Sequence, residues 1–111
     1  MARVYVPGSL DLLAEWVAAG TVPWPAEPIS PDAEDEESEY AALMTAADAS
    51  VELIGGSGRR VVLVAEVASE GHPIPLRRVV AAHADVDDFT DVDDDLAWFA
   101  TQEIPDLLPG A

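Results

Sequence analysis

The segment 21–31 is the strongest single constraint on the fold, because it carries prolines at positions 23, 25, 28 and 31. Proline lacks a backbone N–H and clashes with the preceding helical turn, so a regular helix and a central strand are both excluded here. We therefore predict that residues 21–34 form an extended, Pro-rich and acidic connection. Trp24 is expected to pack inward and anchor this connection, with a role in ligand binding as the alternative.

The residues before this connection predict a strand followed by a helix. Residues 2–7 (ARVYVP) are rich in β-formers and end at a proline, as in a strand that runs into a turn. Ser9 is a good N-cap, and Gly20 suits a helix end. Between them, apolar residues recur at helical spacing, namely Leu10, Leu13, Trp16 and Val17. The first helix is therefore expected between these two residues.

A second helix is predicted after Pro31. Acidic residues open the segment, which favours a helix N-terminus. One face then carries the apolar residues Tyr40, Leu43, Met44, Ala47, Val51 and Ile54. The glycine-rich residues 55–58 end this helix and lead into residues 60–67 (RVVLVAEV), a strand by its β-branched content. An alternative places residues 51–54 in a strand that pairs across the glycine turn.

The C-terminal third predicts another strand and another helix. A loop at residues 71–73 precedes a third strand at 76–83, and strands joined by a short loop normally pair antiparallel. Residues 91–102 are predicted to be helical after an acidic first turn, with the apolar residues Val92, Leu96, Phe99 and Ala100 at helical spacing. Pro105 then predicts an extended tail over residues 105–111.

The resulting order, β-α-α-β-β-α, predicts the α+β fold class. We expect a small antiparallel or mixed three-stranded sheet with helices packed on one face, and a split-βαβ topology is one version of it. The chain has 111 residues, of which half are hydrophobic. That length and composition predict a single domain over residues 1–111.

Composition and charge restrict the cellular context and the partners. The absence of cysteine excludes disulfides, thiolate nucleophiles and Cys-ligated metals. No run reaches the about 20 apolar residues that span a bilayer, and the N-terminus lacks a secretory pattern, so we expect a cytoplasmic protein. The net charge of −17, with arginine as the only basic residue type besides histidine, argues against direct binding to nucleic acid or membranes. A protein partner or a second copy, in a homodimer, is expected instead.

Thirteen of the 22 acidic residues lie in two short runs, six within residues 32–39 and seven within residues 85–95. Each run is expected to supply a negative helix N-terminus and a solvated face. Asp91, Asp93 and Asp95 have the spacing of the first ligands in a calcium loop. Leu96 replaces the required glycine and Gln102 the closing glutamate, so calcium binding is not predicted.

Other metal and nucleophile patterns are equally incomplete. His83 and Asp85 leave a predicted strand on the same side, but two ligands do not form a site, and His72 lies at the far end of that strand. Ser9 is expected to cap a helix rather than to act as a nucleophile. The glycine loop 55–58 follows a helix, the reverse of the phosphate-binding order, and lacks its lysine. No metal and no cofactor are predicted.

The two faces of the strand 60–67 suggest a binding surface. One face carries Val61, Leu63, Ala65 and Val67. The other carries Arg60, Val62, Val64 and Glu66, and Arg3 and Tyr5 are expected to join it from the first strand. If helices cover only one face, the second must meet the tail, the proline-rich loop, a second copy or a partner. We therefore predict a protein–protein contact on this second face.

The two ends of the chain carry recognisable motifs. They are RVYVP at residues 3–7, SEYAA at 38–42, the strand segment 59–67 and WFATQEIPDLL at 98–108. With these motifs the sequence resembles an uncharacterised actinobacterial family of short acidic proteins, a domain of unknown function. The resemblance implies a cytosolic protein and offers no catalytic residue or cofactor to transfer.

The closing motif also carries candidate interaction residues. Trp98 and Phe99 are adjacent, so both cannot point into the same core, and one is expected to pack the tail or to face a partner. Gln102 and Glu103 stand at a predicted helix end where the helix dipole prefers cations. They complete the predicted interaction surface together with Arg3, Tyr5, Val62, Val64 and Trp98.

These observations favour a non-enzymatic interaction or regulatory module, with a homodimer as its simplest form. One alternative is an acidic mimic of nucleic acid whose carboxylates occupy the groove of a basic protein. Another alternative is a small enzyme that uses carboxylates, Glu103, Asp106 or Asp85 with His83, as acid and base.

Overall fold

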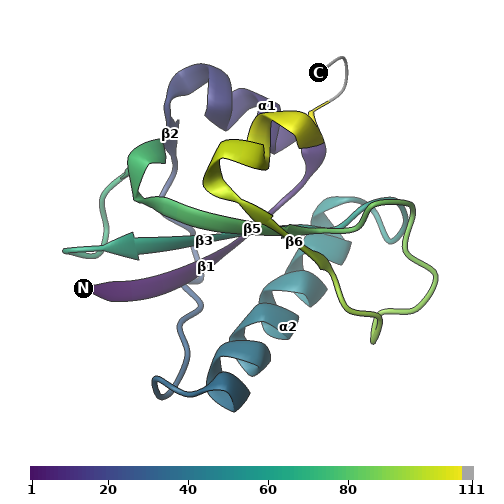
Figure 1. Cartoon of the computed structure of the whole chain (residues 1–111), viewed down its shortest axis with the longest axis horizontal. Coiled ribbons are helices and arrows are strands. Elements are labelled where there is room, and N and C mark those ends of the chain that lie inside the picture. The colour runs from purple at the N-terminus through teal and green to yellow at the C-terminus, as the bar shows by residue number, and fades with distance from the viewer. Residues whose placement is uncertain (109–111) are drawn as a thin grey trace.

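The computed structural model describes residues 1–108 and is built around one four-stranded antiparallel sheet (Figure 1). The strands lie in the spatial order β1-β3-β5-β6. Their bounds are β1 Ala2–Gly8, β3 Val61–Val67, β5 Val79–Ala84 and β6 Ala97–Ala100. A small second sheet pairs β2 (Thr21–Val22) with β4 (Ile74–Pro75).

Within residues 1–108, two α-helices and two short 3₁₀ helices accompany the sheet. They are α1 Leu10–Ala19, α2 Glu36–Leu53, η1 Leu76–Arg78 and η2 Thr101–Leu107. The Oγ atom of Ser9 accepts a hydrogen bond from the Leu12 N–H (3.0 Å), and Gly20 ends α1 in the left-handed conformation. The predicted first helix and both of its end signals are therefore confirmed.

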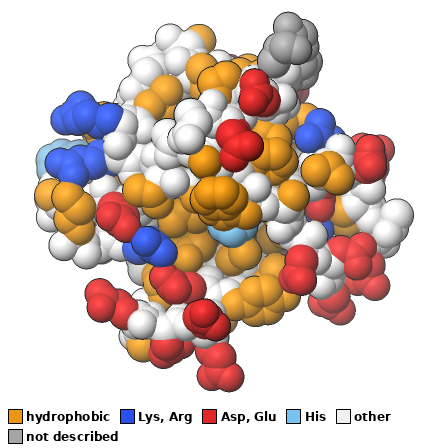
Figure 2. All heavy atoms as spheres, viewed as in Figure 1, with side chains coloured by type: hydrophobic (Ala, Val, Ile, Leu, Met, Phe, Trp, Pro, Cys, Tyr) orange, Lys and Arg blue, Asp and Glu red, His pale blue; other side chains and the backbone are white. Residues whose placement is uncertain are grey.

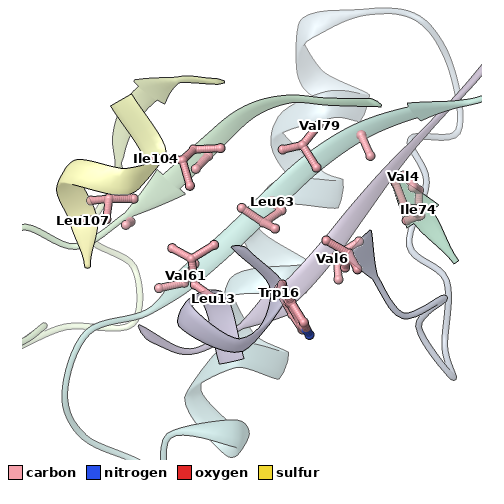
Figure 3. Close-up of a cluster of buried hydrophobic side chains, with 14 of the residues drawn as sticks. Val4, Val6, Leu13, Trp16, Val61, Leu63, Ile74, Val79, Ile104 and Leu107 are labelled. Atoms are coloured by element: carbon pink, nitrogen blue, oxygen red, sulfur yellow. The ribbon is translucent and has the colours of Figure 1, made fainter. Parts of the chain in front are cut away.

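One face of the sheet is covered by α1 and η2, and their apolar side chains form the larger core (Figure 3). Leu13 and Trp16 of α1 meet Val61 and Leu63 of β3 in this cluster. Ile104 and Leu107 of η2 join the same core. The side of β3 that carries Val61, Leu63, Ala65 and Val67 thus faces this core.

The opposite face is packed by α2, which approaches the sheet through small side chains. Ala42 and Ala46, one turn apart, are buried against this face. Ser50, one turn further on, is fully buried. Its hydroxyl donates to the Gly8 carbonyl (2.7 Å) and accepts from the Val61 N–H (3.0 Å), which joins the ends of β1 and β3. Helices therefore lie on both faces of the sheet, and the prediction that they pack on one face is wrong.

The predicted helix over residues 91–102 is also wrong. Residues 97–100 form β6, which adds a fourth strand to the predicted three, and residues 101–107 form η2. The helical spacing of apolar residues was a local cue, and long-range pairing of β6 with β5 overrides it. The tail is not extended from Pro105 to residue 107, because η2 continues through it, and residues 109–111 lie outside the described part of the chain.

Two further predictions about helix packing need correction. The fully buried face of α2 is formed by Ala42, Ala46, Ala47 and Ser50, of which only Ala47 was predicted. The predicted Leu43 and Met44 pack against its margin, and Tyr40 is 50% exposed. Residues 51–53 belong to α2, so the alternative strand at 51–54 is wrong. The Pro-rich connection over residues 21–34 contains no helix, as predicted, and its first two residues form β2. Trp24 packs against the larger core, as expected.

A buried ion pair joins the ends of β3 and β5. The Arg60 guanidinium has no exposed surface and forms two hydrogen bonds to the Asp85 carboxylate, at 2.8 Å from Nε and 2.9 Å from Nη2. The Arg60 N–H donates to the same carboxylate at 2.8 Å. This hydrogen-bonded partner raises the pKa of Arg60 above its ordinary value, so the guanidinium stays charged inside the protein.

The same guanidinium also holds the acidic loop between β5 and β6. It donates to the carbonyls of Val92 and Asp94, each at 3.0 Å, and lies 5.0 Å from the centre of the Phe89 ring. The Phe89 N–H in turn donates to the Gly58 carbonyl at 2.9 Å. A loop rich in mutually repelling carboxylates is thereby fixed through its backbone, which sets the point where β6 begins.

We expect Arg60→Met to lower the free energy of unfolding by about 3–5 kcal/mol, because it leaves a buried carboxylate without its partner. Urea denaturation followed by circular dichroism would measure the loss. The matched control is Arg77→Met at an exposed position, which should stay within about 0.5 kcal/mol of the wild type. Equal midpoints for Arg60→Met and Arg77→Met would contradict a structural role for the ion pair.

Candidate protein-binding face

The α2 face of the sheet is only half covered by its helix. α2 packs over β1 and β3, whereas β5 and β6 extend beyond it (Figure 1). On this uncovered half, His83 of β5 stands opposite Trp98 of β6. The Trp98 side chain is 61% exposed, which is unusual for the largest apolar residue type. A large aromatic surface is thus presented to solvent at one end of the sheet.

Strand alternation explains why Trp98 and Phe99 separate as they do. Leu96 is buried against the cluster beneath α2, so Trp98, two residues later, faces the same side. Phe99 points to the other side and packs against the core under α1 and η2. The adjacent aromatic residues therefore have different environments, and Trp98 is the one left exposed.

His83 lies beneath this exposed face. The side chain is half-buried, and burial lowers the pKa of the imidazole below its ordinary value of 6.5. A neutral imidazole therefore stands next to Trp98 at neutral pH, and the surface here is less polar than the sequence suggests. Val80, the extra residue at a bulge between β3 and β5, is 38% exposed on the same strand.

Tyr40 connects the two acidic runs of the sequence. Its hydroxyl donates a 2.8 Å hydrogen bond to the Asp95 carboxylate, and this bond raises the pKa of Tyr40. Tyr40 is in the first turns of α2, next to the run 32–39, whereas Asp95 ends the run 85–95. Figure 2 shows acidic side chains gathered along the lower and right-hand margins of an apolar central area. We call Val80, His83, Trp98 and Tyr40 the apolar face, and the two runs its acidic rim.

Arg3 closes the rim on the side of β1. Its guanidinium forms ion pairs with Glu39 of α2 and Glu66 of β3, both at 2.8 Å. The hydrogen bond to Glu66 raises the pKa of Arg3. Both partners are partly exposed, so each pair adds little stability, but together they fix α2 against the sheet edge. Arg3 is thus held by two carboxylates rather than presented to a ligand.

The other six predicted interaction residues fall into three groups. Tyr5, Val62 and Val64 are buried beneath α2, so the expectation of an uncovered face there does not hold. Gln102 is exposed on η2. Glu103 is also exposed, and its carboxylate accepts a hydrogen bond from the Ala100 N–H at 2.9 Å. Trp98 remains as the exposed apolar residue of the predicted set.

Three of the residues considered for catalysis or metal binding have other partners. Asp85 is engaged by Arg60, Glu103 caps β6, and the Asp91 carboxylate accepts from the Asp93 N–H at 2.9 Å. Within residues 1–108, no three His, Asp or Glu side chains are placed to hold a metal ion. No helix in the same residues is both long and apolar enough to cross a membrane.

Sequence reasoning missed three members of this site. Tyr40 was assigned to the buried face of the second helix, and Asp95 to an acidic helix start. No local signal links these residues, which are 55 positions apart, because their contact depends on where α2 crosses the sheet. Val80 was likewise placed in a regular strand, where a bulge cannot be read from apolar content.

These features define a small α+β domain with one apolar, tryptophan-bearing face inside an acidic rim. The chain belongs to the family of unknown function DUF6912, whose sequence model matches residues 2–108. The predicted membership of an uncharacterised family is therefore confirmed, whereas the actinobacterial source stays a prediction. No curated protein and no solved structure matches the chain.

We expect acid to destabilise the protein partly through His83. The unfolded chain takes up this proton at the ordinary pKa, whereas the folded protein does so only at lower pH. The unfolded state therefore binds more protons as the pH falls through about 6.5, and the free energy of unfolding decreases until the lowered folded pKa is passed.

His83→Gln should lose this part of the pH dependence, because it removes the titrating group. Urea denaturation of both proteins at about pH 7.5 and about pH 5.5 would measure the difference, with wild type losing more stability on acidification. Parallel pH profiles would show that His83 titrates alike in the folded and unfolded states.

Proposed function

We propose that this protein is a non-enzymatic, cytoplasmic interaction module that binds a basic partner protein on the apolar face. The observation that carries this proposal is Trp98, 61% exposed on a part of the sheet that α2 leaves open. Tryptophan and tyrosine are the residue types most enriched at binding hot spots, and Tyr40 is 50% exposed on the same face.

Charge favours a basic partner over a second copy. The net charge of −17 makes any two copies repel, and the acidic rim would concentrate that repulsion at the contact. The acidic rim would instead attract a partner that carries lysine or arginine around an apolar centre and would speed its association. The apolar centre of that partner could then exclude water from the Trp98 side chain. Homodimerisation remains the competing form of this proposal, and sedimentation at low and high salt distinguishes the two.

The test compares two exposed apolar residues. We expect Trp98→Ala to weaken binding of the partner at least about tenfold, because a central aromatic contact is lost. The control is Leu53→Ala, which removes a side chain of comparable exposure (52%) at the far end of α2 from Tyr40. The partner would be recovered on immobilised protein from nuclease-treated lysate, and its affinity for each variant then measured with purified components.

The outcome has a direct optical readout. In the complex, Trp98 fluorescence should become protected from acrylamide quenching, a change that the Trp98→Ala variant cannot show. Equal affinities of the Trp98→Ala and Leu53→Ala variants for the partner would contradict the proposed face.

A second candidate function, mimicry of nucleic acid, is favoured by the Tyr40–Asp95 hydrogen bond, which brings the two carboxylate runs together. In this case binding would depend on charge rather than on Trp98. We expect a mimic to release its partner completely at high salt and to bind normally after Trp98→Ala. Neutralising Asp87, Asp88, Asp93 and Asp94 to Asn would then abolish binding, which an apolar contact would partly survive.

A further inference from the structure

The two edges of the main sheet differ in their protection. At the β1 edge, the Tyr5 N–H donates to the Ile29 carbonyl at 2.8 Å, so the Pro-rich connection covers part of that strand. At the opposite edge, no strand within residues 1–108 pairs with the outer side of β6. An unprotected strand edge is a template for another extended chain.

The hydrogen-bond pattern identifies which atoms of β6 face outward. The Asp85 N–H donates to the Arg60 carbonyl, so odd-numbered residues of β5 direct their backbone groups at β3 and even-numbered ones at β6. Ala82 and Ala84 pair with Phe99 and Ala97. The backbone N–H and C=O groups of Trp98 therefore point away from β5.

An independent contact supports the same assignment of the outward-pointing backbone groups of β6. The Ala100 N–H, two residues from Trp98, is bonded to the Glu103 carboxylate and so also points outward. Glu103 thus occupies one position of the edge, while no hydrogen bond from a loop or side chain within residues 1–108 engages the Trp98 backbone. The open part of the edge is short and is centred on Trp98.

We propose that this β6 edge binds an extended, basic segment of the partner as an additional antiparallel or parallel strand. This inference rests on the proposed function and specifies how the partner is held: by main-chain hydrogen bonds to Trp98, with side chains alternating over its ring and away from it. Carboxylates flank the edge on both sides, at Asp93, Asp94 and Asp95 before β6 and at Glu103 and Asp106 after it.

These flanking charges determine which kind of segment can bind at the β6 edge. If two copies paired antiparallel with Trp98 opposite Trp98, residues whose numbers sum to 196 would face each other. This pairing extends over β6 only, so the carboxylates just before β6 in one copy, at residues 93–95, would lie at the same end of the strand pair as Glu103 of the other copy, and like charges brought together there are destabilising. Lysine or arginine at either end of a bound segment would meet these carboxylates with opposite charge. A basic segment is therefore the occupant that the edge accommodates.

The test uses a library of nine-residue peptides with lysine at alternate positions and varied apolar residues between, against a matched library with glutamate in place of lysine. We expect wild type to retain lysine peptides selectively and Trp98→Ala to retain them at least about tenfold more weakly. If neither library is retained, or the glutamate peptides bind equally, a basic occupant of this edge is excluded. If Trp98→Ala binds like wild type, the proposed function fails as well.

Strand pairing itself is tested with two N-methylated forms of the lysine peptide that binds best. One form is methylated at the backbone nitrogens of the odd-numbered residues and the other at those of the even-numbered residues, and we call these the two phases. We expect one phase to abolish binding, since it removes the N–H groups facing β6, and the other phase to leave binding within about twofold. Equal effects of both phases would overturn strand addition while leaving the apolar contact of the proposed function intact.

A protein variant gives the complementary result. Trp98→Pro removes the outward N–H as well as the ring, at an edge position where proline is tolerated, and should bind more weakly than Trp98→Ala. Circular dichroism would confirm that it folds. Equal binding by the two variants would count against pairing at this N–H.

Discussion

The buried Arg60–Asp85 pair fixes the position of the most acidic segment of the chain. Its two hydrogen bonds between side chains, and two more to loop carbonyls, hold residues 85–95 through one guanidinium that has no exposed surface. Without it, seven carboxylates would repel one another in a loop with little apolar content. Since β6 begins directly after this loop, the pair also determines the position of Trp98 on the sheet. The apolar face therefore depends on a contact at the same end of β5, made by the residue that directly follows this strand.

The small side chains of α2 have a second consequence for that face. Alanine and serine at positions 42, 46 and 50 bring the helix close to β1 and β3, where Ser50 hydrogen-bonds to both strand ends. A helix seated there cannot also cover β5 and β6, which leaves His83 and Trp98 beyond its edge. The close fit of one half of the sheet and the exposure of the other half thus have the same cause.

Local patterns predicted the elements that local interactions stabilise. The first helix followed from Ser9 and Gly20, and the strand β3 from its β-branched residues. The second helix was found in place, but of its buried small residues only Ala47 was predicted, because the larger apolar side chains were expected on that face. β6 was mistaken for a helix, because four residues of strand carry too little periodicity to outweigh helical spacing around them. Of the candidate site, Trp98 was predicted, whereas Tyr40, Asp95 and Val80 were not.

The sequence by itself determined the α+β class, the acidic character and the family, because composition, caps and motifs are properties of neighbouring residues. Only the tertiary structure decided which sheet face stays open, which arginine is buried and which strand lies at the edge. Arg3 and Arg60 illustrate the difference, since both were expected on the same face of the sheet. One lies at the surface between two glutamates, while the other is enclosed with Asp85. Long-range packing separates them, because a charge can be buried only where the fold supplies a partner for every donor.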